Sequence, residues 1–228
     1  MDALMNRYLE RVVKFLNTYE DEEAVKTWKE KFGEDVVSVT DIAAECLRVS
    51  YFNKKYGQRL SLEKTNVLFL GKALHQLPLL DKRELVLGWN GIVGVIDDYG
   101  ELEMNGRKYY VLIDKKFGEY NLSRKTKANE HHIRQVLYYS VLLRENGFPV
   151  DKIFIMYVNP HERNGMPVFI EVKQPLYEAI KSEMLERRKI LVRALRDGVP
   201  PPRNIGWMCR YCEWVQECFG DGHGRDNE

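Results

Sequence analysis

The sequence predicts a mixed α/β domain in which a central mixed sheet is flanked by helices. Three stretches support this class. Residues 89–118 read as two strands joined by a turn, residues 130–145 have a strong helical pattern, and residues 152–158 (KIFIMYV) form a clear apolar strand. The apolar run at 109–113 is typical of a strand that is buried on both faces.

Helices are expected before these strands. Residues 2–31 place apolar side chains near helical spacing among many charges, which predicts a packing helix or two. Ser38 or Thr40 can cap a second helix over about 41–56. A third helix is expected over 62–80, ending near Pro78.

Acidic side chains are expected at the ends of the two central strands. Asp97 and Asp98 end the first strand, and Asp114 ends the second, with Lys116 two residues later. Because side chains alternate along a strand, Asp114 and Lys116 share one face while Lys115 points away. Two carboxylates and an ammonium at neighbouring strand ends would suit a divalent metal and a phosphate.

The remaining elements follow from turn and helix signals. The pairs Asn105–Gly106 and Asn164–Gly165 predict hairpin turns, the second before a strand over 166–172. A long amphipathic helix is expected over 176–196, followed by an irregular segment and a disordered tail over 220–228. The basic residues of 121–129 predict either a solvated loop or a lip that contacts phosphate; they are Arg124, Lys125 and Lys127.

Composition describes an ordinary globular protein. The 228 residues suit one domain, 44% are hydrophobic, 30% are charged, and the formal net charge is +1, which neither favours nor excludes nucleic acid. No run is long enough for a membrane span and the N-terminus is charged throughout, so a cytoplasmic protein is expected, without membrane partners.

Three of the four cysteines lie close together in sequence. Cys209, Cys212 and Cys218 form C-x2-C-x5-C, and Cys46 is far upstream. Four thiolates can bind either Zn²⁺ or an iron–sulfur cluster, and residue chemistry alone leaves both open.

Six short pieces in a fixed order resemble a known family. They are the upstream Cys46, GKALH with His75, GVID with Asp97, VLIDKK with Asp114 and Lys116, QVLYY with Gln135 and Tyr139, and CRYCEWVQEC. In this order they resemble the PD-(D/E)xK nuclease superfamily, in its RecB-like branch with an iron–sulfur cluster, and within it the CRISPR-associated Cas-four exonucleases. One departure is Leu47, where that family commonly has proline.

The resemblance implies a restriction-endonuclease-like core over residues 81–175. An N-terminal helical region, 1–80, would carry the first cluster cysteine and His75, and the segment 176–228 would carry the other cysteines. Asp97, Asp114, the backbone carbonyl of Lys115, and His75 would bind Mn²⁺ or Mg²⁺. Lys116 would position the attacking water or stabilise negative charge. Gln135 and Tyr139 would orient Lys116 and contact DNA, and the four cysteines would hold a cluster, expected to be 4Fe-4S.

The function implied is a metal-dependent deoxyribonuclease that digests single-stranded DNA from an end. In CRISPR adaptation, a part of antiviral defence, it would trim spacer precursors for the integrase proteins. A stand-alone repair nuclease or a viral homologue would suit the same residues. Two other classes stay open: a DNA-binding iron–sulfur module with little turnover, and a zinc-ribbon protein with an unrelated body. Phe117 and Tyr120 are candidates for base stacking or for plain packing, and an oligomer is compatible with the sequence.

Overall fold

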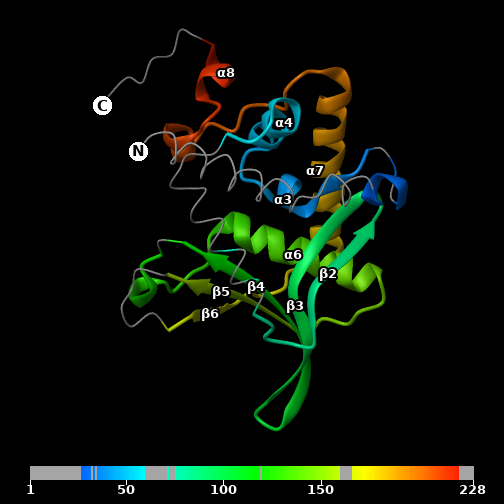
Figure 1. Ribbon diagram of the computed structural model, residues 1–228, viewed down its shortest axis with the longest axis vertical. Coiled ribbons are helices and arrows are strands. Elements are labelled where there is room, and N and C mark those ends of the chain that lie inside the picture. The colour runs from blue at the N-terminus through cyan, green and yellow to red at the C-terminus, as the bar shows by residue number, and fades with distance from the viewer. Residues whose placement is uncertain are drawn as a thin grey trace, which may run out of the picture.

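The computed structural model describes residues 27–31, 33, 35–59, 71, 75, 77–118, 120–159 and 166–220. The predicted α/β class is confirmed, because a mixed sheet carries helices against it (Figure 1). The strands are β1 Val37–Ser38, β2 Lys82–Trp89, β3 Ile92–Met104, β4 Arg107–Phe117, β5 Lys152–Val158 and β6 Val168–Glu171. The helices described over their full length are α3 Val39–Ala43, α4 Leu47–Tyr56, α6 Glu130–Glu145, α7 Tyr177–Asp197 and α8 Val215–Phe219, with 3-10 turns η1 Leu122–Arg124 and η2 Trp207–Tyr211. Residues 27–31 are also helical.

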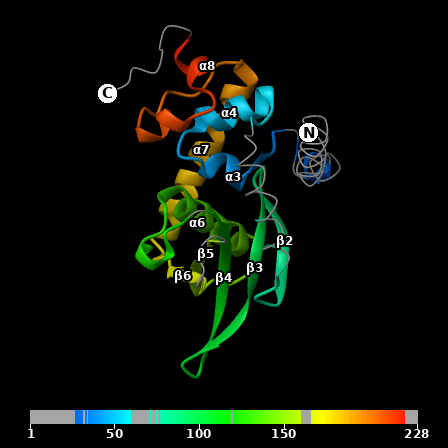
Figure 2. The same ribbon diagram turned by 60° about the vertical axis from the view of Figure 1, so that its left-hand side comes forward.

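The sheet has the order β1-β3-β4-β5-β6, and β2 also pairs with β3. The β2–β3, β3–β4 and β5–β6 pairs are antiparallel, whereas β1–β3 and β4–β5 are parallel. The parallel β4–β5 pair needs a long crossover connection, and α6 supplies it. The β3–β4 hairpin projects away from the helices (Figure 2). At its tip Asn105 and Gly106 have φ angles of 55° and 72°, so the predicted turn is confirmed.

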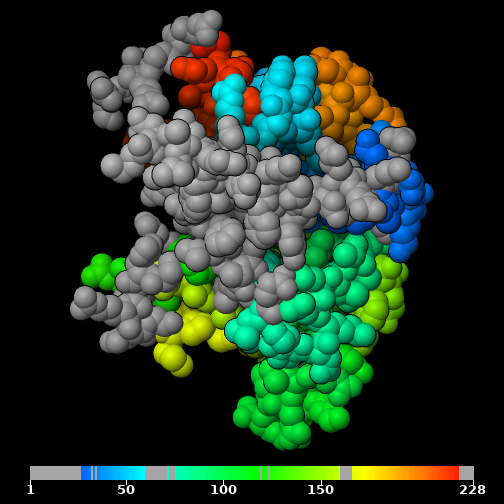
Figure 3. Space-filling model, in the orientation of Figure 1, coloured from blue at the N-terminus to red at the C-terminus, as the bar shows by residue number. Residues whose placement is uncertain are grey.

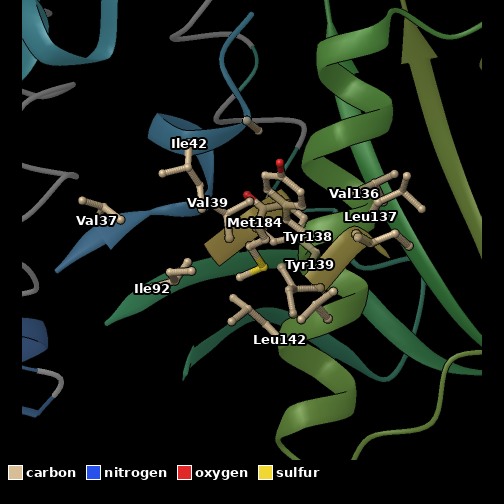
Figure 4. Packing of buried hydrophobic residues seen from close by; sticks show 14 of the residues in the cluster. Val37, Val39, Ile42, Ile92, Val136, Leu137, Tyr138, Tyr139, Leu142 and Met184 are labelled. Carbon is tan, nitrogen blue, oxygen red and sulfur yellow. The ribbon is translucent and has the colours of Figure 1, made fainter. Parts of the chain in front are cut away.

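The main core lies between α6, α7, α3 and one face of the sheet. Tyr138 and Leu142 of α6, Met184 of α7, Ile42 of α3 and Ile92 of β3 are all fully buried there (Figure 4). The opposite face of the sheet carries a smaller cluster formed by Val111, Ile113 and Met156, and the partly buried Leu79 and Leu80 pack against it. The chain segment just before β2 thus covers the face that α6 leaves free.

The C-terminal segment docks on α4, far from it in sequence. Figure 3 shows the two in contact at one end of the molecule. Trp214 is fully buried, its ring stacks on Phe52 with centroids 5.4 Å apart, and its Nε1 donates to Asn53 Oδ1 at 2.7 Å. The guanidinium of Arg59 lies 4.0 Å from the centre of the same ring.

Several elements agree with the sequence prediction in position. Helix α6 and strand β5 have the predicted bounds, α7 begins and ends one residue later than expected, and β6 lies within 166–172. Ser38 caps α3 with Asp41 in a reciprocal capping box, as its position before the helix indicated. Among the described helices, none has the length and apolar character that a membrane crossing requires.

Other expectations were wrong or fall outside the description. The helix expected over 41–56 is interrupted at 44–46, so Cys46 lies at the N-cap of α4. Strand β2 was not predicted, although Asn90 and Gly91 have φ angles of 47° and 69° and form the turn that joins it to β3. Residues 77–81 are not helical. Most of the helices expected over 2–31 and 62–80, the Asn164–Gly165 turn and the tail 221–228 lie outside the described residues.

Candidate active site

The candidate site lies where β3 and β4 separate. Their ladder ends at the pair Asp98–Ile113, and beyond it β4 pairs only with β5. Asp97 and Asp114 are the next residue on each strand past this fork. The expectation that Asp97 ends its strand was wrong, since β3 continues to Met104. Asp97 and Asp114 are nevertheless neighbours, because they occupy the opposing positions that follow the last pair, Asp98 and Ile113.

The backbone around Asp97 departs from regular pairing. The β2–β3 register passes from Leu85–Ile96 to Arg83–Asp98 and leaves out Glu84 and Asp97. Glu84 has a φ of 48°, a conformation that residues other than glycine rarely adopt. The register is the same on both sides of this gap, and sequence reasoning had no signal for it.

Asp97 is 5% exposed and has two partners, one on each oxygen. Its Oδ2 accepts a hydrogen bond from the backbone N–H of Lys115 at 2.7 Å. Its Oδ1 lies 3.0 Å from Nδ1 of His75, so the histidine predicted for the site reaches it. Burial opposes the charged imidazolium, but the hydrogen bond and charge of Asp97 outweigh it and raise the pKa of His75.

A continuous line of polar side chains joins β4 to α6. Lys116 Nζ lies 2.9 Å from Asp114 Oδ2 and donates to Gln135 Oε1 at 2.9 Å. Gln135 Nε2 in turn donates to the hydroxyl of Tyr139 at 2.9 Å and to Thr40 Oγ1 at 3.4 Å. Sequence analysis considered Thr40 only as a helix cap, because its contact with Gln135 arises only when α3 packs on α6.

Tyr139 is 5% exposed, so its ring belongs to the core and its hydroxyl serves Gln135. Burial raises the pKa of Tyr139, and the nearby charge of Asp114 raises it further. The phenol therefore stays protonated throughout the physiological range. The expectation that Tyr139 contacts DNA does not fit this burial.

Asp114 is 1% exposed, and burial raises its pKa to about 6 against the opposing charge of Lys116. Its Oδ2 makes no hydrogen bond of good geometry with any described residue, although the Lys116 ammonium is close enough for an ion pair. A buried carboxylate oxygen without a hydrogen bond is what a hard cation would complete, because such cations take oxygen ligands.

The described residues contain no group of three or more His, Cys, Asp or Glu side chains arranged to hold a metal ion. The carboxylates of Asp97 and Asp114, the latter with an oxygen that lacks a hydrogen bond, nevertheless fit an oxygen-ligated Mg²⁺ or Mn²⁺. His75 would have to exchange its contact with Asp97 for a contact with such an ion.

Lys115 points away from this site, as the strand periodicity predicted. Its ammonium is completely buried on the opposite face of the sheet, 2.5 Å from Asp98 Oδ2. Asp98 therefore lies on the opposite face of the sheet from Asp97, paired with Lys115.

The basic loop before α6 is only partly free. Lys125 donates to Asn129 Oδ1 at 2.6 Å and lies 4.7 Å from the centre of the Tyr157 ring, whereas Arg124 and Lys127 are exposed. Tyr120 packs edge-on against Tyr157 with ring centroids 4.7 Å apart, as its packing role would require.

The two histidines at the start of α6 are not surface residues. His132 is buried, and its Nδ1 lies 2.9 Å from the hydroxyl of Tyr157. Burial, together with the positive charge of Lys116, lowers the pKa of His132 to about 2. His131 is half-buried and lines a cavity that the cysteines share.

All four cysteines line one cavity of about 520 Å³ between the start of α4 and the C-terminal segment. Each is a free thiol, and Arg48 Nη1 lies 3.6 Å from Cys218 Sγ. Burial raises the pKa of the Cys212 thiol, and the other three thiols raise it further. The chain thus brings Cys46 to the C-x2-C-x5-C motif. Within the described part of the chain these thiols do not form a group that would hold a metal, so the cluster stays a prediction.

Two exposed aromatic rings stand at the rim of this cavity. Trp207 is 67% exposed and Tyr211 is 72% exposed, with ring centroids 6.4 Å apart. Arg203 lines the same cavity. Sequence analysis did not single out this pair.

Comparison with known proteins gives a family match and two structural likenesses. The chain matches the PD-(D/E)XK nuclease superfamily over residues 2–219. It is similar in structure to SSO0001, a protein with a known crystal structure, with a TM-score of 0.52 and 19% sequence identity over 91% of this chain and 96% of that chain. An alkaline exonuclease (LHK-Exo) from Laribacter hongkongensis has a TM-score of 0.46 and 10% identity, covering 76% of this chain and 97% of that one. The first likeness shows a shared fold. No curated protein matches the sequence.

Proposed function

Since this chain belongs to the PD-(D/E)XK nuclease superfamily, we propose that it is a metal-dependent deoxyribonuclease that digests single-stranded DNA from an end. The observation that carries the proposal is the buried Asp114 next to Asp97, with the Lys116 ammonium held between Asp114 and Gln135. Phosphodiester hydrolysis needs a nucleophilic water and positive charge at the phosphate, and this residue set is suited to supply both.

In this proposal Asp97, Asp114, the Lys115 carbonyl and His75 hold Mn²⁺ or Mg²⁺. The ion, when bound, supplies Lewis-acid charge at the phosphate and lowers the pKa of a water molecule. Imidazole as a ligand favours Mn²⁺ over Mg²⁺, because Mg²⁺ is bound chiefly by oxygen.

The remaining residues act on the phosphate and on one another. Lys116 orients the attacking water or neutralises the negative charge that develops on the phosphate oxygens. Gln135 holds the ammonium through its Oε1 atom, and Tyr139 holds Gln135 through a hydroxyl that accepts its amide N–H. Tyr139 is thus assigned a positioning role, because its ring is buried.

The preference for single strands is supported by the exposed rings of Trp207 and Tyr211. Unpaired bases stack on exposed aromatic side chains, each contact contributing about 1–3 kcal/mol. The cavity beside these rings extends to His131, one helical turn before Gln135 on α6. A single DNA strand whose end lies at Asp114 would therefore pass the cavity lined by the cysteines, where Arg203 adds positive charge.

We also propose that the four cysteines hold an iron–sulfur cluster of the 4Fe-4S type. The support is that Cys46, Cys209, Cys212 and Cys218 are all free and line one cavity. Zinc is the alternative for four thiols. Protein purified without oxygen should be brown and contain iron and acid-labile sulfide, whereas colourless protein with stoichiometric zinc would contradict the cluster.

The cellular role proposed is the trimming of spacer precursors in CRISPR adaptation, in the cytoplasm and together with the integrase proteins. It rests on the sequence resemblance to the Cas-four exonucleases alone. The same activity would serve a stand-alone repair nuclease. Stable co-elution with purified CRISPR integrase would favour the first setting, and its absence would favour the second.

The test of the activity is digestion of single-stranded DNA labelled at either end. Reactions contain Mn²⁺, Mg²⁺ or EDTA and compare the wild type with Lys116→Ala, and Lys108→Ala in the exposed hairpin is the control. We expect metal-dependent shortening that Lys116→Ala abolishes and Lys108→Ala retains. Gel-shift binding without turnover in any metal would instead favour a DNA-binding module.

A further inference from the structure

A buried ion pair lies on the face of the sheet opposite the candidate active site. Asp98 and Lys115 are completely inaccessible, and their charged groups approach to 2.5 Å. Neither side chain reaches Asp114 or Lys116, because each points to the other face of its strand. Burying two charges is costly and contributes little net stability, so a pair of this kind calls for another explanation.

The pair holds one short segment from both sides. Asp98 Oδ1 accepts hydrogen bonds from the backbone N–H groups of Leu79 at 2.8 Å and Leu80 at 3.1 Å. Lys115 Nζ donates to the backbone carbonyl of Leu77. Leu79 and Leu80 also pack on the small apolar cluster of this face. Residues 77–80 have no helix or strand hydrogen bonds of their own, so the ion pair supplies their backbone partners.

His75 precedes this held segment by two residues. Two residues of chain span at most about 7 Å, so the position of Leu77 restricts where His75 can lie. The His75 ring reaches the other face of the sheet, where Nδ1 lies 3.0 Å from Asp97 Oδ1. Two consecutive residues of β3 therefore contact the same stretch of chain. Asp98 accepts hydrogen bonds from the backbone of Leu79 and Leu80, and Asp97 contacts the ring of His75.

We propose that the buried Asp98–Lys115 pair is a positioning device that holds the segment 77–80 and thereby places His75 at Asp97. This inference rests on the proposed metal site, where His75 is a ligand. The side chains of Asp98 and Lys115 touch neither the ion nor the substrate in this assignment, where Lys115 meets the ion only through its backbone carbonyl. Their effect on the site passes through the backbone of residues 77–80.

Two double variants separate the effect of the hydrogen bonds to the backbone of residues 77–80 from the effect of the charges of Asp98 and Lys115. Asp98→Leu with Lys115→Met removes both charges and every hydrogen bond to residues 77–80. Asp98→Asn with Lys115→Met removes the same charges but keeps an amide oxygen that can accept from Leu79 and Leu80. Both replace the pair by uncharged groups, which avoids leaving one buried charge without a partner. Leu191→Ala, a buried site on α7, controls for general loss of stability.

The first measurement is Mn²⁺ affinity by titration calorimetry, without DNA. Groups that orient a metal ligand typically change affinity 10–100-fold. We expect the Leu/Met variant to bind Mn²⁺ at least tenfold more weakly than the wild type, and the Asn/Met variant and Leu191→Ala to stay within about threefold. Adding His75→Ala should weaken the wild type but not the Leu/Met variant, because His75 is already displaced there.

The second measurement needs no metal. The ring signals of His75, assigned by comparison with His75→Ala, should shift toward those of a free histidine in the Leu/Met variant and stay near the wild type in the Asn/Met variant. Unchanged signals and unchanged Mn²⁺ affinity in the Leu/Met variant would overturn the inference. Wild-type protein that binds no Mn²⁺ would instead overturn the metal site, while the ring signals still decide the positioning of His75.

Discussion

Lys115 and Lys116 are adjacent residues with the same side chain and different surroundings. Lys116 reaches Asp114 and Gln135 on the α6 side of the sheet, while Lys115 is enclosed with Asp98 on the other side. The alternation of a strand is sufficient to produce this difference. A lysine-to-alanine change therefore has different consequences at the two positions: at Lys116 it removes a group from the site, and at Lys115 it leaves a buried carboxylate without its cation.

The first prediction concerns the support of Lys116. Gln135→Met removes the Oε1 acceptor 2.9 Å from the ammonium, and Tyr139→Phe removes only the hydroxyl behind it. We expect about a tenfold fall in kcat for Gln135→Met and a smaller fall for Tyr139→Phe, by analogy with other outer partners of a metal site. Single-turnover digestion of labelled DNA measures both. An equal or larger effect of Tyr139→Phe would contradict the assignment in which Gln135 supports Lys116 directly and Tyr139 acts only through Gln135.

The second prediction concerns His132 and pH. A histidine has a pKa near 6.5 in the unfolded chain, whereas burial lowers that of folded His132 to about 2. Below pH 6.5 the histidine becomes protonated in the unfolded chain but stays neutral in the folded protein. The contribution of His132 to the free energy of unfolding is therefore fully present above pH 6.5 and is lost as the pH falls. The expected loss between pH 7.5 and pH 5 is about 2 kcal/mol from this residue.

Urea unfolding at several pH values, in EDTA, measures this loss. His132→Phe keeps an aromatic ring beside Tyr157 without a titrating group, so its stability should fall less steeply with acid. The comparison of the two slopes removes the contributions of the other titrating groups. Identical slopes would show that His132 takes up its proton at the same pH in the folded and the unfolded protein.

At the scale of elements, α6 determines the site because it packs tightly on β3. A Cβ atom added to Gly94 would lie 2.8 Å from Cε1 of Tyr139 and 2.9 Å from Cδ1 of Leu142. The close approach of helix to strand therefore requires glycine at this position. It also brings Gln135, one turn before Tyr139, within reach of Lys116.

The third prediction follows from this packing. Gly94→Ala forces Tyr139 or Leu142 to move, and overpacking of this kind costs about 1–3 kcal/mol of unfolding free energy. Gly206→Ala is a matched control, because an added Cβ there meets no atom within 4 Å. Denaturant unfolding compares the two variants with the wild type. A Gly94→Ala protein as stable as the control would mean that α6 can shift at no cost.

The elements that sequence predicted well are those with a complete local signal. Helix α6 has a continuous apolar face and ends before Gly147, and strand β5 is apolar throughout, so their bounds were correct. Strand β2 was missed because it is partly exposed and alternates poorly, although Asn90–Gly91 was an available turn signal. The break between α3 and α4 was missed because no glycine or proline marks it.

In the candidate site, too, the features with a local sequence signal were predicted and those that depend on packing were not. Sequence order and spacing predicted a site with His75, Asp97, Asp114, Lys116 and Gln135. The structure pairs His75 with Asp97, and Lys116 with Asp114 and Gln135. The irregular pairing at Glu84, the contribution of Thr40 and the buried position of His132 depend on how separate elements pack. No local pattern in the sequence encodes such contacts.

At the scale of the whole molecule, one side chain anchors the C-terminal segment. Trp214 is enclosed by Phe52, Tyr56 and Arg59, all from α4 or just after it. Tyr51 adds a second contact, because its hydroxyl donates to the carbonyl of Gly198 at 2.7 Å. These contacts join the two parts of the chain that carry cysteines.

The fourth prediction tests this anchor. Trp214→Ala should lower the free energy of unfolding by about 3–5 kcal/mol, as removal of a buried aromatic side chain does. Trp207→Ala is the matched control, since an exposed side chain should cost less than about 0.5 kcal/mol. Thermal and urea unfolding measure both. Equal stability of the two variants would show that another contact holds the segment.

The docking of Trp214 on α4 also has a consequence during protein synthesis. Asn53 and Trp214 are 161 residues apart, and ribosomes add about 5–20 residues per second, so roughly 10–30 s separate the appearance of the two. Throughout that interval the aromatic side of α4 stays uncovered on the nascent chain and is open to chaperones or to neighbouring nascent chains. Because Cys46 is the N-cap of the same helix, its thiol is synthesised a similar time before Cys209, Cys212 and Cys218. Slower translation lengthens this exposure, so yield of soluble protein should respond to codon choice in the intervening stretch more than to codon choice after it.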